Sequence, residues 1–100
     1  MAEIMFIKKI QDRLEVYGDL NFQTVVKIWQ QSQSLLEGQI IKIDLKHVKC
    51  VNSAGLVLLL EWIRYARKMQ RTIQFFHIPP QLIFIAKAAN INNIIMPYIA

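Results

Sequence analysis

The residues of this chain that could do chemistry are Ser53, a candidate nucleophile, and two histidines that could act as its base, His47 and His77. Ser53 stands at a predicted junction of strand, loop and helix, where the first backbone N–H groups of a helix can bind an anion. Neither histidine has the spacing of a known catalytic triad. The nucleophile-elbow pattern G-x-S-x-G is also missing, since Val51 occupies the position of its first glycine. The sequence therefore predicts a chain without catalytic activity.

Metal and nucleotide sites are not predicted either. A single cysteine, Cys50, and two scattered histidines offer no pair of ligands at helical or loop spacing. The phosphate-binding pattern GxxxxGKS/T is absent, so we do not expect the chain to hydrolyse nucleotides by itself. We therefore expect no metal and no cofactor.

The cysteine content and the N-terminal residues bear on the cellular compartment. Cys50 has no second cysteine to pair with inside the chain, which fits a reducing environment. The start, MAEIMFIKKIQDR, lacks the long apolar region and the small-residue cleavage site of a signal peptide. The longest apolar run, residues 54–60, is far shorter than a bilayer span. We expect a cytoplasmic domain without a transmembrane helix.

Composition and charge favour a protein partner. Apolar residue types make up 54% of the 100 residues, above the usual share for soluble domains. A domain of this size cannot bury all of that surface, and exposed apolar patches usually mark partner sites. The net charge of +5 is spread along the chain and no nucleic-acid motif is present, so we expect no nucleic-acid partner. Two alternatives remain for what the basic residues contact: an acidic surface of a protein partner, or anionic lipid headgroups.

Hydrophobic periodicity predicts alternating strands and helices. Strands are predicted at residues 4–9, 13–17, 40–45 and 72–78, where β-branched and apolar residues cluster or alternate. Helices are predicted at residues 21–37, 53–70 and 81–90, with Asn21 as a cap of the first and Asn90 as the stop of the last. We expect Gly18 and Asp19 to end the second strand, and residues 46–51 to form a loop.

The predicted order is β-β-α-β-α-β-α, in one domain spanning residues 1–100. Such an order with short connections favours a small mixed β-sheet with helices packed on it, an α/β fold. A right-handed crossover would make strands 40–45 and 72–78 parallel. The apolar tail, residues 91–100, should pack back on the domain. The first helix should place along one side Phe22, Val25, Val26, Trp29 and Leu36, together with Ser32 or Gln33.

The stretch VNSAGLVLLL, residues 51–60, places two small polar residues ahead of helix turns that have no polar face. Asn52 or Ser53 can cap this helix, worth about 1 kcal/mol, and Gly55 would allow close packing on the preceding strand. Capping does not explain why Val57 and Leu58 are both apolar. A helix packed on a sheet buries one side only, so at least one of these residues should point outward. A hydroxyl beside exposed apolar residues suits an interaction surface, and phosphorylation there would add a charge of about −2.

The segment IDLKHVKCVNSAGLVLLLEWIRYARKMQRTIQFFHI resembles the signature region of STAS domains, the family of the anti-sigma-factor antagonists. Ile43-Asp44-Leu45 matches the end of the family's I-D-L strand, and Asn52-Ser53-Ala54-Gly55-Leu56 matches its D-S/T-x-G-L turn. Gly18-Asp19-Leu20 is similar to the family's G-E/D-L turn and LIFIAKAANI to its last helix, so the resemblance covers nearly the whole chain. Asn52 departs from the pattern, because it keeps the capping oxygen of the usual aspartate but not its charge.

Within that family, the chain most resembles the small STAS subunits of phospholipid ABC transporters that maintain outer-membrane lipid asymmetry. The resemblance implies a non-enzymatic subunit that binds the transporter's ATPase and, through it, the permease, at the inner membrane. It implies that Ser53 lies at the contact. The alternative is an anti-sigma-factor antagonist in which a partner kinase phosphorylates Ser53. The hypothesis for the partner-binding residues is Asn52, Ser53, Ala54, Gly55, Val57 and Leu58.

Overall fold

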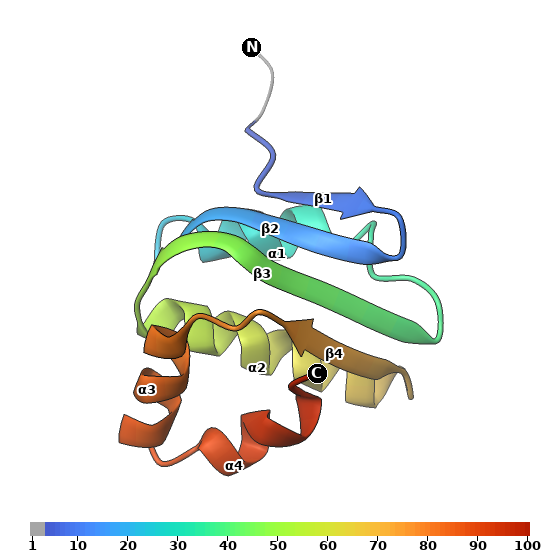
Figure 1. Ribbon diagram of the computed structural model, residues 1–100. Helices are drawn as coiled ribbons and strands as arrows, with labels where there is room; N and C mark the ends of the chain where they lie inside the picture. Colours follow the sequence, from blue (N-terminus) through green and yellow to red (C-terminus); the bar gives the residue numbers. More distant parts are fainter. Residues whose placement is uncertain (1–3) are drawn as a thin grey trace.

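Four strands form one mixed sheet in the computed structural model, which describes residues 4–100 (Figure 1). Their order across the sheet is β1-β2-β3-β4. β1 and β2 form an antiparallel hairpin, whereas the pairs β2–β3 and β3–β4 are parallel. The predicted α/β class and the parallel pairing of the third and fourth strands are confirmed. The strands are β1 Ile7–Ile10, β2 Arg13–Leu20, β3 Ile40–Val51 and β4 Thr72–Phe76.

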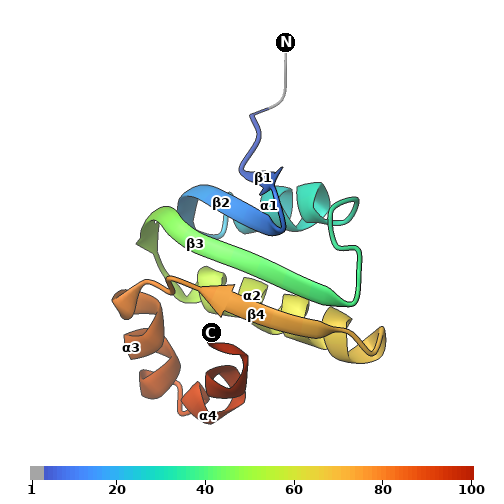
Figure 2. The ribbon, with the colours of Figure 1, turned by 45° about the vertical axis from the view of Figure 1, so that its right-hand side comes forward.

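Two helices cover one face of this sheet, and the C-terminal helices gather beside β4. Figures 1 and 2 show α1 behind β1 and β2, and α2 behind β3 and β4, while α3 and α4 lie beyond the edge of the sheet. No helix of residues 4–100 covers the opposite face of the sheet. The helices are α1 Val25–Ser32, α2 Ser53–Lys68, α3 Pro80–Ala88 and α4 Asn92–Ile95, and a 3-10 turn, η1, spans Met96–Tyr98.

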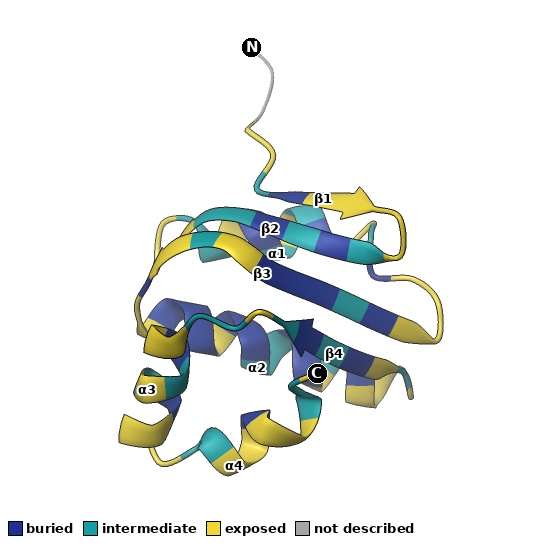
Figure 3. Ribbon diagram, in the orientation of Figure 1, coloured by how far each residue is buried: buried dark blue, intermediate teal, exposed yellow. Residues whose placement is uncertain are grey.

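The core lies between the sheet and α2. Alternate residues of the three longer strands point to the helices, as the period of two in a strand requires. Figure 3 shows the buried residues concentrated in the middle of the sheet and along α2. Trp62 of α2 is fully buried, and its indole N–H donates to the hydroxyl of Ser32 at 3.1 Å. This bond satisfies two buried polar groups and joins α2 to the end of α1.

The third strand is longer than the sequence predicts, and the predicted loop at residues 46–51 is wrong. β2 does not end at Gly18 and Asp19 but continues to Leu20, which pairs with Val51 at the end of β3. Gly18 has φ +90°, which a glycine adopts freely, and the β2–β3 register shifts on either side of it. An irregular but continuous ladder therefore extends both strands.

The first helix is shorter than predicted. The side chain of Asn21 accepts from the N–H groups of Gln23 at 2.9 Å and Thr24 at 3.0 Å, as a cap does, but the regular helix starts only at Val25. It ends at Ser32, whose hydroxyl donates to the carbonyl of Trp29 at 2.7 Å, a local bond that competes with helix propagation.

The buried side of α1 also differs from the prediction. Ile28 and Ser32 are buried, which confirms the expectation for Ser32. Phe22 and Val26, expected on the same side, are 69% and 57% exposed. The apolar residues of this region surround too much of a short helix to fit on one side, so some of them face solvent.

The ends of β4 and α3 follow local backbone rules. β4 stops at Phe76, two residues earlier than predicted, because His77 has φ +56° and leaves the extended conformation. Asn90, the predicted stop of the last long helix, has φ +60° and ends α3 as expected. The tail packs back as predicted, since Ile95 is buried and the N–H of Ala100 donates to the carbonyl of Phe75 at 2.9 Å.

One carboxylate is buried within the sheet. Asp44 of β3 is 1% exposed. One of its oxygens lies 2.9 Å from His77 Nδ1 and accepts from the N–H of Lys46 at 3.0 Å, and the other accepts from Arg13 at 3.2 Å. Burial by itself raises the pKa of Asp44, but the hydrogen bonds from His77, from Lys46 and from Arg13 outweigh it, so the pKa lies below its usual value. The ionised carboxylate thus ties β3 to β2 and to the end of β4.

Replacing this carboxylate should destabilise the domain in a pH-dependent way. Asp44→Ala should lower the free energy of unfolding by on the order of 2 kcal/mol at neutral pH, because it removes the acceptor of three bonds. The folded state binds fewer protons at Asp44 than the unfolded state, so this contribution is present above about pH 4 and is lost as pH falls further. Urea unfolding at neutral pH and at about pH 3 checks this.

The stability difference between wild type and variant should shrink at the lower pH. A difference that is equal at both pH values would contradict this role. Asp12→Ala is the matched control, because that carboxylate is exposed and its one ion pair within residues 4–100 is with Lys42. This control should change stability little.

Candidate functional site

The junction between β3 and α2 is fixed by Asn52. This residue is extended, with φ −132° and ψ −168°, and its side-chain oxygen accepts from the N–H of Ala54 at 2.8 Å. Its own N–H donates to the carbonyl of Leu20 at 3.0 Å, and its carbonyl accepts from Gly55 at 3.0 Å. The predicted helix cap is therefore Asn52 and not Ser53.

Ser53 is left free for other contacts. It is the first residue of α2 and is exposed, and its hydroxyl has no hydrogen-bond partner within residues 4–100. Its position one residue after the cap places it at the positive end of the helix dipole, where an acceptor or anion from a partner is favoured. Within residues 4–100, the side chain of Ser53 therefore makes no hydrogen bond that would stabilise the fold.

Gly55 brings α2 unusually close to the sheet. A Cβ atom at this position would lie 3.0 Å from Leu20 Cβ, 3.2 Å from Leu20 Cδ1 and 3.5 Å from Leu82 Cδ1. The expected close packing is present, but the strand that α2 approaches here is β2 and not the preceding β3. The absence of a side chain at Gly55 therefore sets the depth at which the helix sits.

The first turns of α2 divide clearly into two sides. Val57 is 52% exposed and Leu58 only 3% exposed, so Val57 points outward and Leu58 points into the core. Ala54 and Gly55 are also buried, so they have little surface to offer a partner. Ser53 and Val57 are four residues apart and share the outward face.

An open apolar groove lies beside this face, between α1 and α2. Its volume is about 230 Å³. Sequence reasoning missed the contribution of α1, because it expected the apolar residues of that helix to face the core. The sequence did contain a signal for this groove: the stretch from Phe22 to Trp29 has more apolar residues than one side of a short helix can bury. The groove is lined by Val25, Val26 and Trp29 of α1 and by Val57, Leu58 and Glu61 of α2.

The geometry offers Ser53 no catalytic partner. The ring of His47 stacks on Tyr17 with centroids 4.7 Å apart, and its Nε2 lies 3.3 Å from the carboxylate of Glu15. His77 is bonded to Asp44. Neither histidine is hydrogen-bonded to Ser53. Residues 4–100 also contain no group of three histidine, cysteine or acidic side chains that could hold a metal ion.

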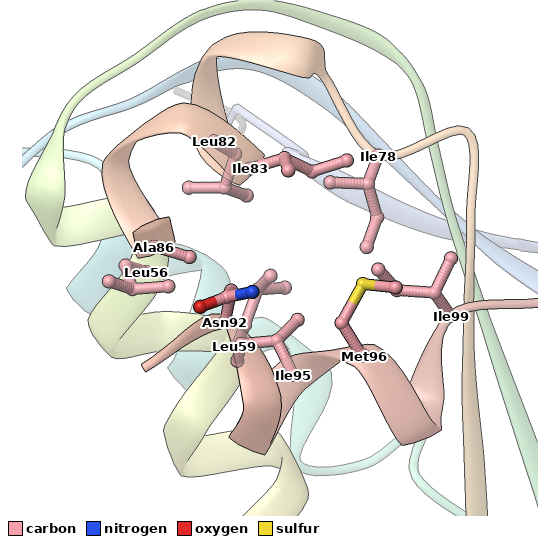
Figure 4. Close-up of a pocket in the computed structure, with 10 residues that line it drawn as sticks. All are labelled: Leu56, Leu59, Ile78, Leu82, Ile83, Ala86, Asn92, Ile95, Met96 and Ile99. Atoms are coloured by element: carbon pink, nitrogen blue, oxygen red, sulfur yellow. The ribbon is translucent and has the colours of Figure 1, made fainter. Parts of the chain in front are cut away.

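A lipid-sized cavity is not formed beneath the C-terminal helices. The space there has a volume of about 10 Å³, enough for at most about one water molecule. No helix among the described residues is long and apolar enough to cross a bilayer. Figure 4 shows the side chains that line this space: Leu56, Leu59, Ile78, Leu82, Ile83, Ala86, Asn92, Ile95, Met96 and Ile99.

Comparisons with known proteins find a family model and curated relatives that match nearly the whole chain. The family model described as "Mlab, STAS domain" matches residues 7–97. The intermembrane phospholipid transport system binding protein MlaB of Haemophilus influenzae is 26% identical, over 93% of this chain and 95% of that protein. MlaB of Escherichia coli K12 is 27% identical, over 97% of this chain and 99% of that protein.

A solved structure shows the same fold. The anti-sigma factor antagonist SpoIIAA in its unphosphorylated form superposes with a TM-score of 0.62 and 17% sequence identity. The match covers 94% of this chain and 84% of that one. At this identity the likeness concerns the fold alone.

The close contact at Gly55 should make this position intolerant of a side chain. Gly55→Ala should lower the free energy of unfolding by about 1 kcal/mol, because overpacking costs about 1–3 kcal/mol and outweighs the roughly 1 kcal/mol gained in helix propensity. Leu20 Cβ is attached to the backbone of β2 and cannot rotate away. Urea unfolding measures the change, with Ser53→Ala as a neighbouring control that should alter stability little. A more stable Gly55→Ala variant would show that β2 yields to the added methyl group.

Proposed function

The chain belongs to the MlaB-type STAS-domain family, and we propose that it is a non-catalytic subunit that binds the ATPase of an intermembrane phospholipid transporter. The observation that carries this proposal is an exposed Ser53 whose hydroxyl has no hydrogen-bond partner within residues 4–100, next to an open apolar groove. Full-length similarity to the MlaB proteins supports the transporter as the setting. The ATPase would be MlaF-like, and the permease would be reached through it.

The proposed contact is the α1–α2 surface, defined here as Val25, Val26, Trp29, Ser53 and Val57. Val26 and Val57 are each more than half exposed, so a partner that covers them removes apolar area from water. Burial of apolar area contributes roughly 25 cal/mol per Å², and well-packed apolar residues at the centre of an interface usually dominate its affinity. Ser53 at the edge of this surface would accept or donate a hydrogen bond across the contact.

The structure around this surface suits a binding subunit. α1 and α2 are joined by the buried bond between Trp62 and Ser32, so the walls of the groove are already positioned before a partner arrives. A preformed surface avoids much of the ordering cost of association. The subunit would thereby support assembly and activity of the ATPase from the cytoplasmic side of the inner membrane, in a system that maintains outer-membrane lipid asymmetry.

A negative charge introduced at Ser53 tests whether this residue lies in the contact with the ATPase. Ser53→Glu should weaken binding of the ATPase, because a carboxylate must be desolvated next to apolar residues. The fold should persist, since the position is exposed and an acidic residue suits the first turn of a helix. A tagged pull-down from native membranes, with partners identified by mass spectrometry, checks this. Ser34→Glu introduces the same side chain at another exposed position and should retain the ATPase and permease.

Two outcomes contradict the proposal in different ways. Normal ATPase recovery with Ser53→Glu would remove Ser53 from the contact. Recovery of a soluble kinase in place of an ABC ATPase would favour an anti-sigma-factor antagonist phosphorylated at Ser53.

The apolar part of the surface has its own test. Val57→Asp should weaken ATPase binding roughly tenfold or more, because it places a charge at the groove. Ile94→Asp is the matched control, since Ile94 lies on α4 and is 49% exposed, close to the 52% of Val57. Isothermal titration with purified ATPase compares the two variants. Equal affinities for both variants would show that the contact lies elsewhere.

A further inference from the structure

The C-terminal half of β3 has one bare edge. β4 pairs with β3 only from Ile40 to Asp44, whereas β2 continues to pair along the other edge as far as Val51. Residues 45–51 therefore have a neighbouring strand on one side only. Figures 1 and 2 show the chain after β4 leading into α3 as an irregular segment, which is not part of a strand. A strand edge with unpaired backbone groups is a template for an added strand.

The segment after β4 cannot close this edge. His77 has φ +56°, which turns the chain out of the extended conformation. Pro79 and Pro80 follow, and neither has a backbone N–H to donate. No backbone hydrogen bond within the described part of the chain joins residues 45–51 to residues 77–80.

The direction of the backbone groups can be derived at the end of the strand. Leu20 and Val51 are partners in the parallel ladder, and the N–H of Asn52 donates to the carbonyl of Leu20. In a parallel pair this pattern means that the polar groups of Leu20 face β3, while those of Val51 point to the opposite edge. The N–H and carbonyl of Val51 therefore face the side that β4 leaves uncovered.

A cleft follows this bare edge. Its volume is about 410 Å³. Lys46 and Lys49 are exposed, and neither pairs with an acidic side chain of residues 4–100. The nearby carboxylate of Asp44 is buried and already bonded. The cleft combines these lysines with apolar contacts, and its walls include Lys46, Val48 and Lys49 of β3 and His77, Ile78 and Pro79 of the following segment.

We propose that this cleft binds an extended acidic peptide segment, which adds to the sheet as a strand along residues 45–51 of β3. Backbone hydrogen bonds to the bare edge would supply affinity, and apolar side chains of the segment would pack against Val48 and Ile78. Its carboxylates would meet Lys46 and Lys49, which fits the chain's net charge of +5. The same lysines repel a second copy of this chain, which excludes self-pairing as the use of the edge.

This surface is separate from the α1–α2 surface, and the inference does not rest on the proposed function. The acidic segment can belong to any protein that presents it in extended form.

The test uses the full chain and a fluorescein-labelled peptide of about eight residues that alternates aspartate or glutamate with valine. We expect the fluorescence anisotropy of the peptide to rise on binding. Lys46→Glu combined with Lys49→Glu should weaken binding at least about tenfold, because two attractive contacts become repulsive. Arg67→Glu combined with Lys68→Glu is the matched control, since it changes the net charge equally at the exposed end of α2 and should leave the affinity nearly unchanged.

Backbone pairing is tested separately from charge. The same peptide methylated at alternate backbone nitrogens keeps its carboxylates but loses half of its donors, and it should bind at least about tenfold more weakly. Hydrogen exchange of the Val51 amide should slow when the unmethylated peptide is bound. Equal binding of the methylated peptide would overturn strand addition. Absence of binding up to millimolar peptide, or binding of vesicles with anionic headgroups at the same lysines instead, would overturn the proposal.

Discussion

The close approach of α2 to β2 at Gly55 and Leu20 is the contact on which the rest of the structure depends. Leu20 is fully buried, and its carbonyl accepts the N–H of Asn52 directly before the helix begins. The hydrogen bond and the missing Cβ together place the start of α2 against the sheet. Once the helix is seated there, its helical period directs Leu56 and Leu59 into the core and leaves Ser53 and Val57 facing solvent.

The groove beside that face is a consequence of two polar groups in the core. Trp62 and Ser32 are both fully buried, and their hydrogen bond fixes α1 at one distance from α2. A purely apolar contact would allow the short α1 to slide, whereas a buried hydrogen bond left unmade costs about 1–3 kcal/mol. The exposed apolar residues of α1 and α2 are thereby kept side by side, as a partner surface requires.

The sequence was sufficient for the alternation of strands and helices, the parallel pair, a polar cap at the start of α2 and the stop at Asn90, because each depends on local residue types. It left Asn52 and Ser53 as alternatives for that cap, and the structure identifies Asn52. It was not sufficient for residues 46–51, since KHVKCV has no strong alternation and becomes a strand only by pairing with β2. It also misjudged Phe22 and Val26, because the regular helix starts only at Val25 and the apolar residues of this region surround more of it than one side can bury. The candidate site was found through Ser53, while the contribution of α1 required the structure.

Contact between the α1–α2 surface and a transporter ATPase, as we propose it, can be measured directly. The most direct measurement is hydrogen exchange by mass spectrometry on the unmodified chain, free and bound to the purified ATPase. We expect slower exchange on binding in α1 and in the first two turns of α2, with α3 and α4 unchanged. Protection of α3 and α4 with none in α1 and α2 would contradict it.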